Sequence, residues 1–188
     1  AIAVQQAGLE LELCDLRHGH CDIDAAALRA ACDERTLAII PTHLAGRVAD
    51  VDDALAVARQ VGAYVIEDAA QALGARRDGV SVGLAGDVGF FSLAAGKGLS
   101  IYEGGLLLAR DPSLRERLAR TAARLVPHNS GMEWKRRIEL LGYAALYRPR
   151  GLGLAYGAPL RHALRRGDPV AAVGDDFPLT IPLHRVGR

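Results

Sequence analysis

Short apolar runs, separated by amphipathic or glycine-rich segments, mark the first part of the chain. Residues 37–41, 64–66 and 88–93 are such runs, and residues 105–109 form a fourth; the strand predicted from the second run also includes Glu67. Short apolar runs are typical of strands buried in a parallel sheet. Residues 9–15 instead alternate apolar and acidic side chains, so we expect there a strand near a sheet edge with one exposed face.

Between the second and third of these five predicted strands the apolar positions recur with helical spacing. Residues 51–61 predict an amphipathic helix, with Asp50 as its N-cap and Gly62 at its end. Its apolar face would consist of Val51, Ala54, Leu55, Ala58 and Val61. A second helix is expected at residues 25–32, capped by Asp22 or Asp24. Strands alternating with helices indicate a parallel sheet with helices packed on it.

The later part of the chain has a different character. Pro112 begins a predicted helix at residues 113–125, whose outer face is rich in arginine. Residues 132–147 and 159–166 also predict helices. The glycine-rich segment 74–86 is expected to be a loop. The sequence RPRGLGLAYGAPL is interrupted by Gly and Pro, so we interpret it as a linker, and no element is predicted in the tail DDFPLTIPLHRVGR.

Composition limits the protein class. The chain has 188 residues, half of them hydrophobic, and no apolar run reaches the roughly 18 residues of a membrane span. Residues 1–8 lack the basic and apolar regions of a secretory signal, so we expect a soluble, cytoplasmic protein. The segment CDLRHGHC brings cysteine and histidine together, but its spacing fits no usual zinc site. We interpret it as a solvated loop with reduced cysteines and expect no metal.

Charge is distributed unevenly along the chain. Residues 1–94 carry 7 Arg and 14 acidic residues, whereas residues 95–188 carry 16 Lys plus Arg and 8 acidic residues. A basic half can serve an anionic substrate, a nucleic acid or a membrane. The basic residues are not interleaved with aromatic ones in the way that binds single-stranded nucleic acid. A substrate phosphate, or docking on the acidic half, is the simpler interpretation, and neither nucleic acid nor membrane is expected as a partner.

Three chemically useful side chains follow two of the predicted strands. Asp68 follows the strand at 64–67, Ser92 lies near the end of the strand at 88–93, and Lys97 follows it. Ligands of open α/β sheets bind at the carboxyl ends of strands. A carboxylate, a hydroxyl and an amine suit pyridoxal 5'-phosphate, whose ring nitrogen, phosphate and aldehyde need these groups. A solvent-exposed loop lysine remains the alternative for Lys97.

The order EDAAQALGA, GDVGFFSL, Lys97 and EGG resembles the DegT/StrS-type sugar aminotransferases, which are fold-type I pyridoxal-phosphate enzymes. The segment TLAIIPTHLAGRVADVDDALAVARQVGAYVIEDAA is also similar to that family. The resemblance covers about residues 1–120 and implies an α/β fold, a three-layer structure with a mainly parallel sheet. It implies that residues 1–126 are a portion of the cofactor-binding large domain without its N-terminal part. Residues 127–188 would then connect toward a small domain.

The resemblance also implies roles for individual residues. Asp68 would hold the ring nitrogen, Gln71 would lie against the ring or its 3′ oxygen, Ser92 would bind the phosphate, and Lys97 would carry the cofactor and move the proton. A branch of the family has histidine in place of this lysine and dehydrates its substrate, so Lys97 favours amino transfer. The alternatives are a turn-capping aspartate, an exposed glutamine and an ordinary strand serine.

The resemblance finally implies a reaction and partners. An amino acid, most often glutamate, would donate the amino group to a nucleotide-linked keto-sugar, and the enzyme would be a homodimer. The phosphate-binding turn and helix of that family are not recognisable before residue 1. A non-catalytic regulatory or partner-binding homologue is therefore the second hypothesis. A nucleotide-binding α/β domain is the third, but it requires a glycine-rich turn after the first strand, which the sequence lacks.

Overall fold

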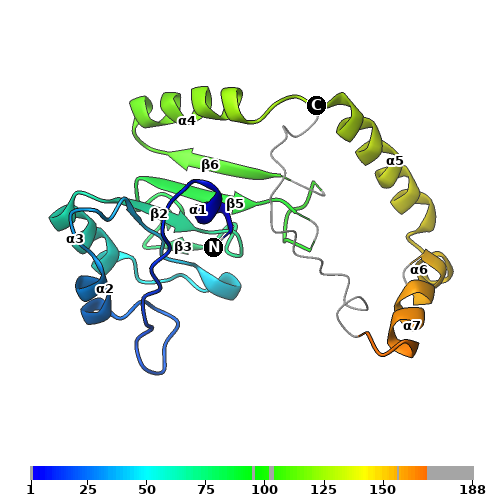
Figure 1. Cartoon of the computed structure of the whole chain (residues 1–188), viewed down its shortest axis with the longest axis horizontal. Helices are drawn as coiled ribbons and strands as arrows, with labels where there is room; N and C mark the ends of the chain where they lie inside the picture. Colours follow the sequence, from blue (N-terminus) through cyan, green and yellow to red (C-terminus); the bar gives the residue numbers. More distant parts are fainter. Residues whose placement is uncertain (1, 95, 102–103, 156, 169–188) are drawn as a thin grey trace. The chain divides into compact units, whose positions relative to one another are not determined.

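The computed structural model describes residues 2–94, 96–101, 104–155 and 157–168. Contacts divide the chain into two compact units. The sheet unit is Leu11–Arg124, and the helical unit is Ala1–Glu10 with Leu125–Arg188. All strands of the described residues lie in the sheet unit (Figure 1). The predicted functional division at residue 126 stays a prediction.

A four-stranded sheet forms the centre of the sheet unit, in the order β1-β2-β5-β6. Its strands are β1 (Ala38–Ile39), β2 (Tyr64–Asp68), β5 (Val88–Ser92) and β6 (Gly105–Ala109). Strands β1, β2 and β5 are parallel, and β6 is antiparallel to β5. The four apolar runs therefore form strands as predicted, and the expectation of an α/β fold with a mainly parallel sheet is confirmed.

Two helices cover one face of this sheet (Figure 1). They are α2 (Ala25–Ala31) and α3 (Asp52–Val61). Their buried residues Leu28, Ala54, Val57 and Ala58 form one core with Ile39 of β1 and Val65 of β2. We call the face that bears Ile39 and Val65 the helix-covered face. On the second face Tyr64 is 40% and Leu107 58% exposed.

The helix ends follow local rules. The Asp24 side chain accepts hydrogen bonds from the backbone N–H groups of Ala26 and Ala27, so it is Asp24 that caps α2. Helix α3 ends at Gly62, whose φ of 76° is left-handed, as predicted. Its predicted cap was wrong by one position, because Val51 is the N-cap. Asp50 nevertheless accepts a hydrogen bond from the Asp52 N–H at 3.1 Å.

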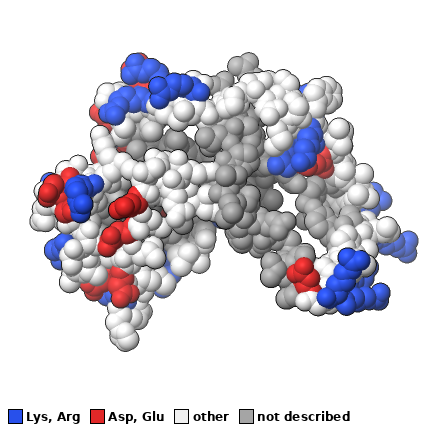
Figure 2. Space-filling view, in the orientation of Figure 1, with Lys and Arg blue, Asp and Glu red and all other residues white. Residues whose placement is uncertain are grey.

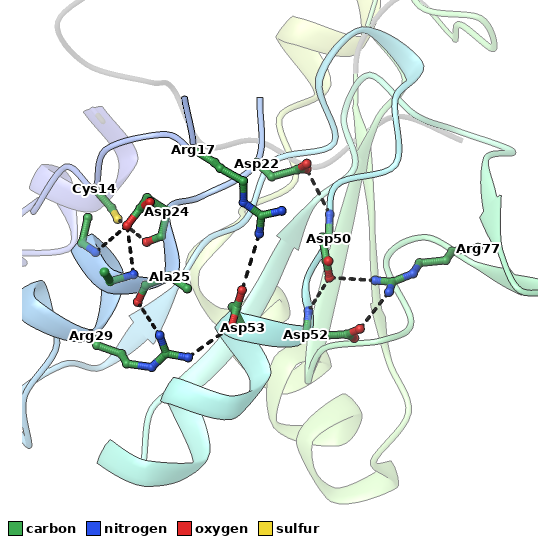
Figure 3. A network of polar contacts seen from close by, with 12 residues as sticks. Cys14, Arg17, Asp22, Asp24, Ala25, Arg29, Asp50, Asp52, Asp53 and Arg77 are labelled. Carbon is green, nitrogen blue, oxygen red and sulfur yellow. Dashed lines mark hydrogen bonds and ion pairs between the residues drawn. The ribbon is translucent and has the colours of Figure 1, made fainter. Parts of the chain in front are cut away.

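Ion pairs gather around the beginning of α3 (Figure 3). They are Arg17–Asp53 at 3.7 Å, Arg29–Asp53 at 3.2 Å, Arg77–Asp50 at 3.0 Å and Arg77–Asp52 at 2.7 Å. Asp22 also accepts a hydrogen bond from the Asp50 N–H at 3.1 Å. These pairs join three separate segments at the edge of the sheet unit, and each is individually weak because it is partly exposed.

One strand prediction and one loop prediction need correction. Residues 9–15 form no strand, although their pattern alternates. Leu13 is 84% exposed, and only Leu16 makes an isolated bridge, to Ile23. Alternation alone does not make a strand, since the backbone also needs a neighbouring strand with which to pair. Within the predicted loop 74–86, β3 (Arg76–Arg77) and β4 (Val80–Ser81) form a short antiparallel hairpin.

Helix α4 (Pro112–Leu125) follows β6 and begins at the predicted proline. None of its residues is buried. Figure 2 shows basic side chains along it, in agreement with its arginine-rich sequence. A single 3-10 turn, η1 (Leu44–Gly46), lies between β1 and α3, with Ala45 at a φ of 52°.

The helical unit contains four helices among its described residues. These are α1 (Ile2–Gln6), α5 (Ser130–Leu146), α6 (Pro149–Ala155) and α7 (Gly157–Arg165). Helices α5 and α7 agree with prediction, but α6 corrects the linker interpretation. Proline is favourable at the first position of a helix, and this is where Pro149 stands. The tail at 175–188 lies outside the described residues, and no described helix could cross a membrane.

Candidate active site

Backbone register places two of the predicted site residues at one edge of the sheet. In the parallel pairing of β2 with β5, Asp68 lies opposite Phe90, and Glu67 lies opposite Gly89. Side chains alternate along a strand, so Asp68, Phe90 and Ser92 share one face. Asp68 and Ser92 are the last residues of their strands. They therefore stand at the carboxyl ends of neighbouring parallel strands, on the second face.

Asp68 is half-buried and only partly engaged. Its Oδ1 accepts a hydrogen bond from the Ala70 N–H at 3.0 Å, which stabilises the turn after β2. Its backbone N–H donates to Pro41 O at 2.9 Å, and its carbonyl oxygen accepts from the His43 N–H at 2.9 Å. Within the described residues Oδ2 has no hydrogen-bond partner. The alternative role of turn capping is thus real, but it uses one carboxylate oxygen and leaves the other available.

Gln71 lies in the turn after β2 and is tied to a separate segment. Its Oε1 accepts a hydrogen bond from the Ala45 N–H at 3.0 Å. The side chain is exposed, and its NH₂ group has no partner among the described residues. A side chain held by its oxygen in this way has both amide hydrogens free to donate to a ligand.

Lys97 lies in a loop that begins and ends at the carboxyl end of β5. The Leu93 N–H donates to Gly104 O at 2.9 Å, and the Ile101 N–H donates to Leu93 O at 3.0 Å, so the loop is closed at its base. Lys97 itself is half-buried, and its amine has no partner within the described residues. Its backbone N–H donates to Ala94 O at 3.2 Å.

The hydroxyl of Ser92 has one weak contact. It accepts a hydrogen bond from the Ala94 N–H at 3.4 Å, so its own hydrogen is free to donate. Asp68 and Ser92 thus share one edge and one face, and Gln71 and Lys97 lie in the two connections that leave that edge. Within the described residues no hydrogen bond or ion pair joins any two of these four side chains.

These groups fit pyridoxal phosphate in their chemistry. A free carboxylate oxygen can accept from a ring N–H, a hydroxyl can donate to a phosphate, and an unpaired amine can react with an aldehyde.

The residues that could bind a metal ion are not clustered. The described residues contain no group of three or more His, Cys, Asp and Glu side chains that could hold a metal ion. Cys14 donates its thiol hydrogen toward Asp24 O at 3.8 Å, and Cys21 is exposed.

Two open cavities of the sheet unit lie elsewhere. Their volumes are about 440 and 320 Å³. Both are lined by Arg77 and Asp78 of the β3–β4 hairpin, and neither is lined by the predicted site residues. The candidate site therefore rests on strand register and on unpartnered polar groups, not on these cavities.

One buried pair behind the site was not predicted. His43 and Glu67 are each 1% exposed, and His43 Nε2 lies 2.9 Å from Glu67 Oε2. Two acidic residues in succession, Glu67 and Asp68, were a signal for it. Alternation along β2 sends them to opposite faces, so one was bound to point into the helix-covered side. The partner histidine carries no such signal in the sequence.

The family model that describes the DegT/DnrJ/EryC1/StrS aminotransferases matches residues 1–145. A pleiotropic regulatory protein of Geobacillus stearothermophilus is 39% identical over 116 residues, which are 61% of this chain and 31% of that protein. A UDP-N-acetyl-3-dehydro-α-D-glucosamine 3-aminotransferase of Acidithiobacillus ferrooxidans is 44% identical over 94 residues, 50% of this chain and 26% of that protein. The chain thus spans about a third or less of these relatives.

A solved structure has a similar fold. The aminotransferase from Psychrobacter cryohalolentis matches with a TM-score of 0.56 and 34% sequence identity, over 60% of this chain and 29% of that chain. The likeness of fold that the sequence motifs implied is therefore confirmed for the part of the chain that is matched.

Proposed function

Because the chain belongs to the DegT/DnrJ/EryC1/StrS aminotransferase family, we propose that the protein transfers an amino group from an amino acid to a keto-sugar with pyridoxal 5'-phosphate as cofactor. The donor in this proposal is glutamate, and the acceptor is a nucleotide-linked keto-sugar. A relative named for a 3-dehydro sugar linked to UDP supports this class of acceptor. The proposal includes a homodimer in the cytoplasm.

The parallel register of β2 and β5 is the observation that supports this function most. It sets a half-free carboxylate and a free hydroxyl on one face and at one edge. The loop that holds the amine of Lys97 returns to that same edge. An acid, a hydroxyl and an amine gathered at the carboxyl ends of strands form the set that this cofactor requires.

Each residue has one task in the proposed reaction. Bound pyridoxal phosphate supplies an aldehyde and an electron-withdrawing ring. Asp68 Oδ2 would accept from the ring N–H, while Oδ1 keeps its bond from Ala70. The Gln71 NH₂ would donate to the 3′ oxygen. The Ser92 hydroxyl would donate to a phosphate oxygen, and a bond to such a charged acceptor is stronger than a neutral one.

Lys97 performs the proton transfer in this proposal. Its Nζ would hold the cofactor at the aldehyde carbon, and the same amine, once free, would move a proton from the α-carbon of the donor to the C4′ carbon of the cofactor. Lys97 is the one residue of the predicted four whose side chain ends in an amine on a flexible chain. Both the attachment of the cofactor and the proton transfer are therefore given to Lys97.

A second candidate function is regulation without catalysis. The relative named a pleiotropic regulatory protein favours it. Such a homologue keeps the fold and needs neither the Lys97 amine nor the second oxygen of Asp68. The two candidates differ in one measurable property, since only the enzyme loses bound pyridoxal when an amino donor is added.

Borohydride reduction followed by peptide mapping tests the proposed enzyme. The purified protein is incubated with pyridoxal phosphate, reduced and digested, and the pyridoxyl adduct is located by mass spectrometry. We expect the adduct on Lys97 and its loss when glutamate is added before reduction. The chain contains one other lysine, Lys135, which serves as an internal control.

Two outcomes would refute the proposal. Labelling of Lys135 at the level of Lys97 would mean nonspecific reaction of exposed amines. A Lys97 adduct that persists in the presence of every amino donor tried would favour the regulatory candidate. The variant Lys97→Arg keeps the positive charge but cannot react with the aldehyde, and it should abolish the specific adduct.

A further inference from the structure

A buried histidine and glutamate lie directly behind the proposed cofactor edge. Glu67 precedes Asp68 in β2 and points to the helix-covered face, opposite the face of Asp68. His43 and Glu67 are each 1% exposed, and their side chains are 2.9 Å apart. Neither residue has a task in the proposed chemistry, so their burial needs another reason.

The hydrogen bonds of His43 fix its tautomer. Its Nδ1 accepts from the Ala49 backbone N–H at 3.0 Å, and a backbone N–H can only donate. The ring proton is therefore on Nε2, which donates to Glu67 Oε2. One imidazole thus joins the end of β2 to the far end of the segment 43–49.

Glu67 collects three further donors from a second loop. Its Oε2 accepts from the Gly83 N–H at 2.8 Å, and its Oε1 accepts from the Ala85 and Gly86 N–H groups, both at 2.7 Å. Burial alone would raise the pKa of Glu67, but the bonds from His43 and these three amides hold its pKa below the ordinary value. A buried carboxylate with four donors is a rigid junction.

The segment 43–49 also holds Asp68 and Gln71, the two residues predicted to contact the cofactor ring. The His43 N–H donates to Asp68 O at 2.9 Å. Two residues on, the Ala45 N–H donates to Gln71 Oε1 at 3.0 Å, from a left-handed backbone with φ of 52°. Such a backbone is costly for alanine unless its surroundings enforce it. The ring of His43 is the side chain that anchors both ends of this turn.

We propose that His43 is a positioning residue that, through Glu67 and the 43–49 turn, sets Asp68 and Gln71 at the ring of the cofactor. The inference rests on the proposed function, because it concerns the geometry of that site. It predicts that loss of the His43 ring weakens cofactor binding and disturbs the hydrogen bond at the ring nitrogen. The Lys97 loop, whose described residues make no hydrogen bond to His43 or Glu67, should keep its reactivity toward aldehydes.

The test compares two variants with a matched core variant. His43→Leu removes both hydrogen bonds of the imidazole, whereas Val57→Ala shortens a buried side chain of α3 that is 2% exposed and lies in the core that α2 and α3 form with β1 and β2. Both variants should lose thermal stability. Cofactor affinity is measured by fluorescence titration with pyridoxal phosphate, and ring-nitrogen bonding by the ¹⁵N chemical shift of labelled cofactor.

We expect His43→Leu to raise the Kd for pyridoxal phosphate about tenfold and to shift the ring ¹⁵N resonance. Val57→Ala should change neither. His43→Gln keeps a donor for Glu67 but loses the acceptor for Ala49, and we expect a rise in Kd of about threefold. If His43→Leu does not fold, His43→Gln decides the question.

An unchanged Kd and ¹⁵N shift in the folded histidine variant would overturn the positioning role. So would an equal rise in Kd for Val57→Ala, because the effect would then follow stability alone. If the unaltered protein binds no pyridoxal phosphate, the proposed function fails and this inference falls with it. Binding by the unaltered protein that is insensitive to His43 overturns the inference alone.

Discussion

Glu67 and Asp68 are neighbours in the chain, yet their carboxylates meet opposite environments. Strand alternation turns one into the helix-covered face, where backbone N–H groups and His43 surround it. The other faces the second side of the sheet with one oxygen unpartnered in the described residues. At the scale of single residues, the carboxylate of Glu67 is suited to stabilise the fold and that of Asp68 to bind a ligand.

The lowered pKa of Glu67 predicts how stability depends on pH. A carboxylate whose pKa is lower in the folded protein stabilises the fold above its ordinary pKa, here 4.5, and this contribution is lost as the pH falls through the lowered pKa. Glu67→Gln should therefore cost about 3 kcal/mol of unfolding free energy at pH 7. The difference in unfolding free energy between Glu67→Gln and the unaltered protein should shrink as the pH falls below 4.5.

Urea unfolding at a series of pH values measures this difference. The exposed Glu34 provides the control, because Glu34→Gln should follow the unaltered protein at every pH. A constant difference between Glu67→Gln and the unaltered protein from neutral to acid pH would contradict the role given to the carboxylate charge.

At the scale of elements, glycines allow the 83–86 loop to reach Glu67. A Cβ on Gly89 would overlap the backbone of Gly83, and a Cβ on Gly86 would lie 2.7 Å from Val65 O. Backbone clashes of this kind cannot be relieved by rotating a side chain. The loop therefore lies directly on β5 and β2, which is what brings its amides within reach of the buried carboxylate.

Gly89→Ala should consequently displace the loop from the sheet. We expect a loss of at least about 3 kcal/mol of unfolding free energy, since both the clash and the lost Glu67 contacts contribute. Gly98→Ala is the matched change, because its Cβ would meet nothing within 4 Å. Thermal unfolding of the two cofactor-free variants compares them, and equal melting temperatures would contradict the close approach.

The success of sequence prediction also differs by element. The apolar runs at residues 64–67 and 88–93 predicted strands correctly, because a buried strand depends mainly on its own composition. Residues 9–15 were predicted wrongly, because a half-exposed strand depends on a partner that the sequence does not specify. Sequence placed Asp68 after a strand, whereas it is the last residue of β2, and it correctly placed Lys97 in the loop after β5. The role of His43 could not, since it depends on Glu67, 24 residues away.

At the scale of the whole molecule, the charge difference between the two halves of the chain favours association. Residues 1–94 carry a net charge of −7, from 7 Arg and 14 acidic residues, and residues 95–188 carry +8, from 16 basic and 8 acidic residues. Opposite charges of this size attract within one chain or between two copies, and salt weakens the attraction. The charge pattern is thus compatible with the proposed homodimer without identifying its interface.

A dimer raises the question of which chain supplies each site residue. Strands β2 and β5 are neighbours in one sheet, so Asp68 and the base of the Lys97 loop belong to the same chain and the same edge. Subunits carrying Asp68→Asn and subunits carrying Lys97→Ala should therefore not complement each other. In every mixed dimer each site carries either Asp68→Asn or Lys97→Ala. The amino-transfer rate of the mixed dimer should therefore be as low as that of the two single variants.

The opposite arrangement would give a clear signal. If Asp68 of one subunit served Lys97 of the other, each mixed dimer would have one intact site, so a random mixture would regain about a quarter and the isolated mixed dimer about half of the unaltered activity. Co-expression with two different affinity tags isolates the mixed dimer for this assay. Asp68→Asn keeps the oxygen that accepts from Ala70, so the turn should persist and any loss can be assigned to the ring contact. Restored activity in the mixed dimer would require a site divided between chains, and the single-sheet site proposed for this protein would be wrong.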